Sequence, residues 1–292
     1  MRVTEKMALG AVTEGVARSV RRLAEASRIA STGERMALPS DDPAGWALTV
    51  GHDARIRGME SRARASTRAA GDLDLAETAL ASAGDLLLEI KELSLRGVNG
   101  SMDHDTRREL GRQVASLRES LLGVANTRGA SGYLFAGTRT DRPPFEASGA
   151  FVGNDGETRL AVTEGTTARS NASGARAFTS AGGRDLFADL SALATALSIE
   201  DLGGIRAGLD ALDAGHRQLL SARTEAGLGA ERLRSAAEVT DGALVHARAA
   251  RAAVAEADLP GALSGLSAAR AAYERGVAVT REVLSLAAIP RG

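Results

Sequence analysis

Apolar residues at helical spacing dominate the first half of the chain. Between Ile56 and Ile90 they follow one another at intervals of three, four or seven residues, which predicts one long helix with a single apolar stripe. Asp42-Pro43 marks the start of this helix, because an Asp side chain accepts hydrogen bonds from the free N–H groups of a first turn and Pro has the backbone angle of a first helical residue. Gly97 marks its end.

Three further helices are predicted downstream. One covers residues 103–124, a shorter one covers residues 186–197, and a long one covers residues 199–254, where spacings of four and three alternate as in a coiled-coil seam. Only a short turn over residues 99–105 separates the first of these from the preceding long helix. We therefore expect those two helices to lie antiparallel and to bury each other's stripes.

The two ends of the chain carry weaker helical patterns, which Pro39 and Pro260 set apart from the rest. Small residues interrupt both, so each helix is marginal alone and depends on packing for its stability. We expect a terminal helical pair, residues 1–40 and 259–292, that is largely unfolded in the free subunit and becomes helical on assembly. The residues expected to form its assembly stripe are Val16, Val20, Leu23, Leu263, Leu266, Tyr273, Val277 and Leu284.

Between residues 129 and 179 the helical period gives way to clusters of Gly, Ser, Thr, Asn and Pro with short apolar runs. This change predicts a small β-rich insertion. Four of the five phenylalanines lie in it, Phe135, Phe145, Phe151 and Phe178. Their grouping favours a compact core that belongs to the insertion itself.

Together these elements predict a mainly α fold. Its main part is a long antiparallel, coiled-coil-like helical bundle formed by the N- and C-terminal halves, and a small β-rich insertion interrupts it. The expected divisions are the terminal helical pair (residues 1–40 and 259–292), a helical rod (residues 41–129 and 183–258) and the insertion (residues 130–182).

The charge balance and the lack of cysteine exclude several classes of binding partner and of chemistry. The 36 basic and 37 acidic residues nearly cancel, so no overall field attracts nucleic acid or an anionic membrane. The absence of cysteine excludes disulfides and cysteine nucleophiles. We expect no cleaved signal peptide, because the N-terminus lacks the apolar run of one, and no membrane span, because no stretch is long and apolar enough.

No motif in the sequence favours catalysis or a cofactor. A phosphate-binding Gly-rich loop and a nucleophile elbow are both lacking, and Asp103-His104-Asp105 is better explained by helix capping than by metal binding. The arginines between Arg55 and Arg68 have no interleaved aromatics, which favours a solvated or subunit-facing surface over a nucleic-acid site. We expect no enzyme, no cofactor and no metal.

Two segments resemble those of bacterial flagellins and hook-associated proteins. The first runs from Ser31 to Gly45 and contains, at the predicted helix start, Ser40, Asp41, Asp42 and Pro43. The second resembles the point where a flagellin-like core leaves its helical hairpin, and it consists of Gly132, Tyr133, Leu134, Phe135, Ala136 and Gly137, followed by Pro144 and Phe145. Residues 258–286 are similar to the C-terminal helix of the family more loosely.

The resemblance implies an extracellular structural subunit of the bacterial flagellum, exported unfolded through the flagellar type III apparatus. The second segment is most similar to the hook-filament junction members of the family. Such a protein assembles into a ring with hook-associated protein 1 below and flagellin above, after a flagellar export chaperone has released it. Neither nucleic acid nor a membrane is among the expected partners.

Two other interpretations stay open at this point. A small flagellin, the filament subunit itself, shares the Asp-Asp-Pro region. An intracellular coiled-coil scaffold shares the helical pattern, although it gives no reason for either signature. The Phe135-Ala136-Gly137 segment and the following Pro144-Phe145 favour the junction protein over the flagellin.

Overall fold

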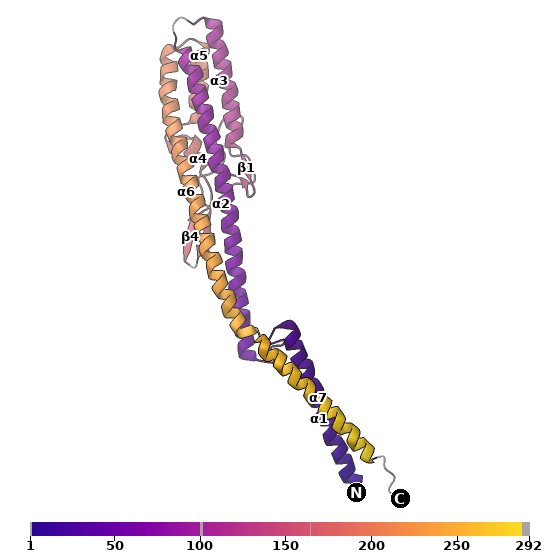
Figure 1. Ribbon diagram of the computed structural model, residues 1–292. Coiled ribbons are helices and arrows are strands. Elements are labelled where there is room, and N and C mark those ends of the chain that lie inside the picture. Colours follow the sequence, from indigo (N-terminus) through magenta and orange to yellow (C-terminus); the bar gives the residue numbers. More distant parts are fainter. Residues whose placement is uncertain (1, 100–101, 164, 288–292) are drawn as a thin grey trace. The chain divides into compact units, whose positions relative to one another are not determined.

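Helices make up most of the chain, as predicted. The computed structural model describes residues 2–99, 102–163 and 165–287. Within them, the mainly α fold with a small β insertion is confirmed (Figure 1). Predictions that fall on residues 1, 100, 101 and 288–292, which include part of the turn at 99–105 and the outer ends of the terminal pair, lie outside the described residues.

The helices are α1 (Arg2–Thr32), α2 (Pro43–Gly97), α3 (His104–Ala125), α4 (Gly174–Phe178), α5 (Leu186–Ser198), α6 (Leu202–Ala255) and α7 (Leu259–Ala287), with a short 3-10 helix η1 (Ser180–Gly182). Two antiparallel hairpins lie between α3 and α4. The first joins β1 (Arg128–Gly129) to β2 (Gly132–Tyr133), and the second joins β3 (Arg159–Thr163) to β4 (Thr166–Arg169).

The chain divides into two compact units. The terminal unit comprises Met1–Arg57 and Leu244–Gly292, and the central unit comprises Gly58–Ala243. Both α2 and α6 contribute to each unit, because the division falls inside these helices. The expected divisions near residues 40 and 259 fall at breaks between helices, and they stay predictions.

In the central unit, α2 and α6 lie side by side and run in opposite directions (Figure 1). Three ion pairs between the helices show the direction, because their residue numbers rise on α2 as they fall on α6: Asp74–Arg234, Glu77–Arg223 and Lys91–Asp213. Exposed pairs of this kind contribute little to stability, roughly 0–1 kcal/mol each. The register of the two helices is set by burial of their apolar stripes, and the ion pairs follow from that register.

Those stripes form the core of the central unit. The predicted α2 positions are buried at Leu73, Leu80, Leu87 and Ile90, and the predicted α6 positions are buried at Ile205, Leu212, Leu219 and Leu233. The helices α3 and α5 pack against each other and extend the same core. Because burial of one Leu or Ile side chain contributes about 1.5–3 kcal/mol, this core is the main stabilising term of the unit.

The insertion does not have a core of its own, and that prediction was wrong. Phe135, Phe145 and Phe178 belong to the same buried cluster as Leu121 of α3 and Phe187 of α5. The rings of Phe145 and Phe187 lie with their centroids 5.1 Å apart. Two hairpins with strands of two to five residues offer too little apolar surface to enclose aromatic rings, so these rings pack against the helices instead.

One buried side chain, Gln218 of α6, holds the end of the insertion. Its Nε2 donates to the carbonyl oxygens of Ala177, Thr179 and Arg184 at 3.1–3.2 Å, and its Oε1 accepts from the backbone N–H of Arg184 at 2.8 Å. These contacts satisfy backbone groups in the link from α4 through η1 to α5. The link therefore depends on one polar side chain from a distant helix.

Replacement of Gln218 by Leu should lower the free energy of unfolding by about 1–3 kcal/mol, because it leaves buried backbone groups without partners. Equilibrium denaturant unfolding of the full chain measures this change. The matched control is Gln113→Leu on the exposed side of α3, where the same substitution should stay within about 0.5 kcal/mol. Equal effects at the two positions would show that the contacts of Gln218 do not stabilise the link.

Candidate functional site

Two connectors lie side by side in the terminal unit. One joins α1 to α2, and the other joins α6 to α7. The N–H of Arg35 donates to the Ala255 carbonyl at 2.9 Å, and the N–H of Ala257 donates to the Gly33 carbonyl at 2.8 Å. Gly33 ends α1 with a φ of +70°, a conformation that favours glycine. These paired hydrogen bonds fix where the two terminal helices leave the rest of their unit.

Asp41 of the first signature closes a tight turn. One oxygen of its side chain, Oδ2, accepts hydrogen bonds from the backbone N–H groups of Ala37 and Leu38, both at 2.9 Å. The bonds from Leu38 and Ala37 lower the pKa of the Asp41 carboxyl below its ordinary value of 3.8. The turn is therefore held by an ionised carboxylate at neutral pH, and its stabilisation is lost only as the pH falls below that value.

Asp42 caps α2. Its Oδ1 accepts from the Gly45 N–H at 2.9 Å, and its Oδ2 lies 3.4 Å from an Arg35 nitrogen. Pro43 is the first helical residue and Ser40 is exposed before it. The signature therefore has two structural roles: Asp41 closes a turn, and Asp42 caps the helix.

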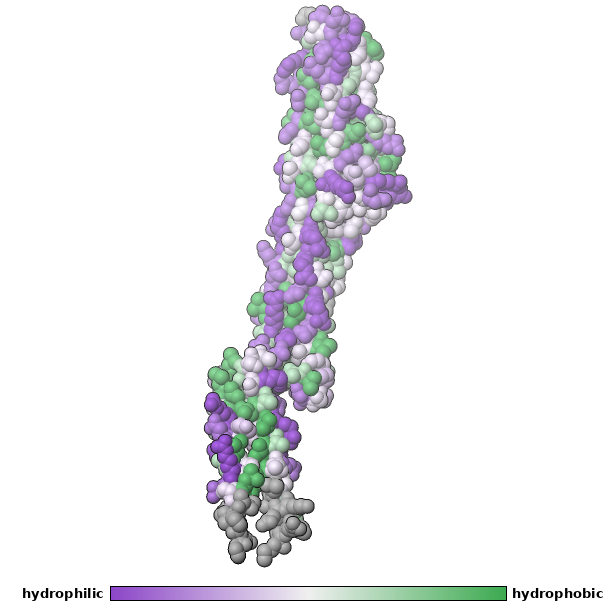
Figure 2. Space-filling view, turned by 90° about the vertical axis from the view of Figure 1, so that its right-hand side faces the viewer, coloured by the Kyte–Doolittle hydropathy of each residue, from purple (hydrophilic) through white to green (hydrophobic). Residues whose placement is uncertain are grey.

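The terminal helices α1 and α7 pack against each other without burying their stripes. None of the side chains that the structure describes on either helix is buried. Val16, Leu23, Leu266, Tyr273 and Val277 are half-buried, while Val20, Leu263 and Leu284 keep 46%, 55% and 50% of their surface exposed. On the face in Figure 2, hydrophobic residues gather over this pair. The expected assembly stripe is therefore only partly covered within one chain.

The second signature links α3 to the insertion. Gly132 and Tyr133 form β2, and the buried residues Leu134, Phe135 and Ala136 follow directly. Gly137 then turns the chain with a φ of +69°, at a point where an added Cβ would lie 2.0 Å from the carbonyl oxygen of Asn154. A larger residue cannot occupy this position without moving the backbone.

Two asparagines that the sequence patterns did not reveal hold this signature. Asn126, after α3, accepts from the Phe145 N–H and donates to the Phe145 carbonyl, both at 3.0 Å. The side-chain oxygen of Asn154 accepts from the Thr138 N–H at 2.8 Å. Pro144 is buried beside Phe145. Both contacts join positions 16–19 residues apart, so no local spacing predicts them.

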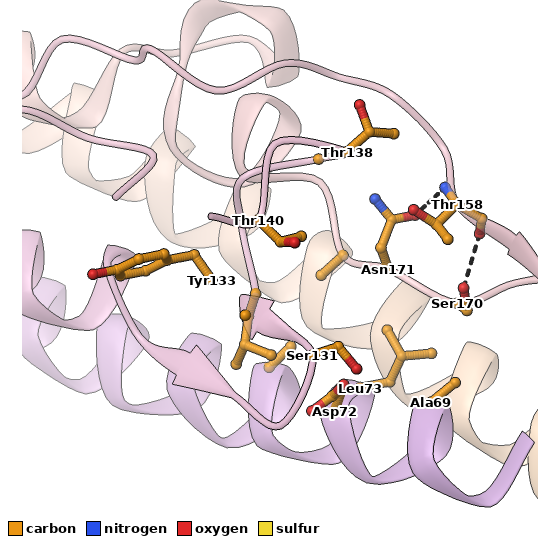
Figure 3. A pocket seen from close by; sticks show the side chains of 15 residues that line it. Ala69, Asp72, Leu73, Ser131, Tyr133, Thr138, Thr140, Thr158, Ser170 and Asn171 are labelled. Atoms are coloured by element: carbon orange, nitrogen blue, oxygen red, sulfur yellow. Dashed lines mark hydrogen bonds between the residues drawn. The ribbon is translucent and has the colours of Figure 1, made fainter. Parts of the chain in front are cut away.

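A pocket of about 240 Å³ lies between α2, the β1–β2 hairpin and the segments next to β3 and β4 (Figure 3). Tyr133 of the second signature and hydroxyl side chains such as Ser131 and Thr140 line it. The charged side chain among its described lining residues, Asp72, already accepts from the Ala130 N–H at 2.9 Å. This lining offers hydrogen bonds but no pair of groups for acid–base chemistry.

The other polar clusters serve structure. Asp103 caps α3 by accepting from the Thr106 N–H at 2.9 Å, which confirms the capping interpretation, and the hydrogen bonds from Thr106 lower the pKa of Asp103. Over the described residues, no group of three or more His, Asp or Glu side chains could hold a metal ion. None of the helices described here is long and apolar enough to cross a membrane.

Comparison with known proteins finds flagellar relatives. Residues 3–140 match the bacterial flagellin N-terminal helical region. The chain is 34% identical over 127 residues to flagellar hook-associated protein 3 of Escherichia coli, and 27% identical over 182 residues to that of Salmonella typhimurium. These alignments cover 42% and 62% of this chain but only 39% and 57% of the two relatives.

Solved structures show the same fold. FlgL of Xanthomonas campestris aligns with a TM-score of 0.59 at 17% identity, over 68% of this chain and 98% of that one. The flagellar junction protein FlgL from Legionella pneumophila aligns with a TM-score of 0.55 at 15% identity, over 71% and 99%. At these identities the likeness establishes the architecture alone. By sequence, residues 3–140 are therefore similar to the bacterial flagellin N-terminal helical region and part of the chain is similar to flagellar hook-associated protein 3, and the fold is similar to that of FlgL.

Proposed function

We propose that the chain is a structural, non-enzymatic subunit of the bacterial flagellum that joins the hook to the filament. The observation that carries this proposal is the terminal pair, in which no stripe residue is buried and Val20, Leu263 and Leu284 keep 46%, 55% and 50% of their surface exposed. Monomeric proteins rarely expose contiguous apolar surface of this kind, whereas a subunit of an assembly buries it against its neighbours. The names of its relatives locate that assembly in the flagellum.

The proposed junction function implies specific binding partners. The subunits form a ring, hook-associated protein 1 lies below it and flagellin lies above it. Full burial of a Val or Leu side chain contributes about 1.5–3 kcal/mol, so covering the remaining exposed surface of several stripe residues per subunit favours association. Export through the flagellar type III apparatus, with a chaperone bound beforehand, fits terminal helices that have no buried side chain of their own among the described residues.

A flagellin is the second candidate. The matched N-terminal region is common to flagellins, and it does not separate the two functions. The junction role is favoured because the two relatives above are both hook-associated protein 3, and because the second signature with the following Pro144 and Phe145 resembles that of junction proteins.

Deletion of the gene separates the candidates in the organism that carries it. A junction protein leaves hooks without filaments and flagellin secreted into the medium, and a plasmid copy of the chain restores filaments. A flagellin instead leaves hooks that still carry the complete set of hook-associated proteins. Normal flagella in the deletion strain would exclude both functions. Electron microscopy and composition analysis of isolated hook–basal bodies distinguish these results.

Charges placed on the assembly stripe should abolish assembly without unfolding the chain. We expect Val20→Glu and Leu263→Glu to remove filaments from the complemented strain, because a desolvated carboxylate at an interface costs several kcal/mol. The unfolding transition of the central unit should be unchanged. The matched control is Ile199→Glu, since Ile199 is 66% exposed at the end of α5 and lies outside the stripe. Filaments in both stripe variants would contradict the proposal.

A further inference from the structure

A groove of about 950 Å³ opens in the central unit between the β3–β4 hairpin and α6. Figure 1 shows β4 beside this part of α6. The floor is apolar, because Leu73, Leu80, Val162 and Ala226, which line it, are all buried side chains. At the rim, Leu228 and Val239 of α6 are more than half exposed. The groove therefore leaves apolar surface in contact with water, which favours a macromolecular occupant.

Arginines outnumber carboxylates among the residues that line this groove. Four arginines line it, Arg159, Arg169, Arg176 and Arg232, against two glutamates, Glu225 and Glu231. Three of these arginines already pair within the chain, Arg159 and Arg169 with Glu157 and Arg176 with Asp155. Arg232 is exposed and has no ion-pair or hydrogen-bond partner within the described part of the chain. A carboxylate is the group that pairs best with such a guanidinium.

A surface of the opposite character lies farther along α2. Asp85, Leu88, Glu89, Glu92 and Leu95 share one face of the helix at spacings of three and four, and all five are exposed. The opposite face, with Leu87 and Ile90, is buried in the core. Asp85 and Glu89 have no partner among the described residues. We call this face the acidic ridge, and it combines two leucines with three carboxylates.

We propose that the groove of one subunit receives the acidic ridge of a second copy of this chain. The leucines of the ridge fit an apolar floor, and its unpaired carboxylates, Asp85 and Glu89, suit the unpaired guanidinium of Arg232. Groove and ridge are different surfaces of the central unit, so the contact is heterologous and each copy offers both halves. Such a contact repeats from subunit to subunit, as a ring requires. This inference rests on the self-assembly proposed above.

The absence of native cysteine allows a direct test. A chain with both Leu88→Cys and Leu228→Cys carries one thiol on the ridge and one on the groove rim. Flagella isolated from the complemented deletion strain are treated with a short bismaleimide. Groove–ridge contact predicts a ladder of covalent dimers, trimers and larger multimers of this chain. Each single-cysteine variant, and the control pair Leu88→Cys with Ile199→Cys, should give no ladder.

Charge exchange tests the specificity of the contact. In the double-cysteine chain, Glu89→Arg should lower the yield of the ladder about tenfold, and addition of Arg232→Glu should restore it, because like charges oppose the contact and opposite charges favour it. Glu119→Arg on the exposed side of α3 serves as the control and should leave the yield unchanged.

Motility is scored in every strain. This second readout distinguishes a failure of the groove–ridge contact from a failure of the proposed junction function. Filaments and normal motility without a ladder would overturn the groove–ridge contact and leave the junction role standing. A covalent product with a different flagellar protein in place of the ladder would overturn it as well, because the groove would then have another occupant. If the unmodified chain does not restore filaments in the deletion strain, that result contradicts the proposed function itself.

Discussion

Burial of the α2 stripe against α6 is the interaction on which the central unit depends. Each helix is too polar over most of its surface to be stable alone, and each has one apolar face that only an antiparallel partner covers. The remaining elements follow from this pairing. The chain must return from the end of α3 to the start of α6, and the segment between them carries the phenylalanines that pack on α3 and α5. The insertion is therefore part of the helical core.

The terminal unit shows what happens when the same kind of helix has too few partners. Two helices side by side cannot cover both of their apolar faces, and α1 and α7 accordingly have no buried side chain among those described. The connectors, in contrast, are fully specified by the Asp41 turn, the Asp42 cap and the two backbone hydrogen bonds to the α6–α7 connector. The chain thus fixes the start of its terminal helices while leaving part of their apolar surface exposed.

Much of this arrangement could be predicted from the sequence, because it depends on periodic patterns. The stripes between Ile56 and Ile90 and along α6 mark the faces that are buried, and Asp42-Pro43 marks the start of α2. The prediction of a separate insertion core failed because the grouping of phenylalanines along the chain does not say which surface they contact. Gln218, Asn126 and Asn154 escaped prediction for a related reason, since each holds backbone groups 16 or more residues away. The groove also required the fold, because the residues that line it come from different elements.

Hydrogen exchange on the free subunit and on the assembled flagellum measures whether α1 and α7 gain their stability from other subunits. We expect strong amide protection in the monomer for α6 between Ile205 and Leu233, where the stripe is buried, and fast exchange for α1 and α7. In the assembly, α1 and α7 should become protected to a similar degree. Strong protection of α1 and α7 already in the monomer would contradict the claim that these helices depend on other subunits for their stability.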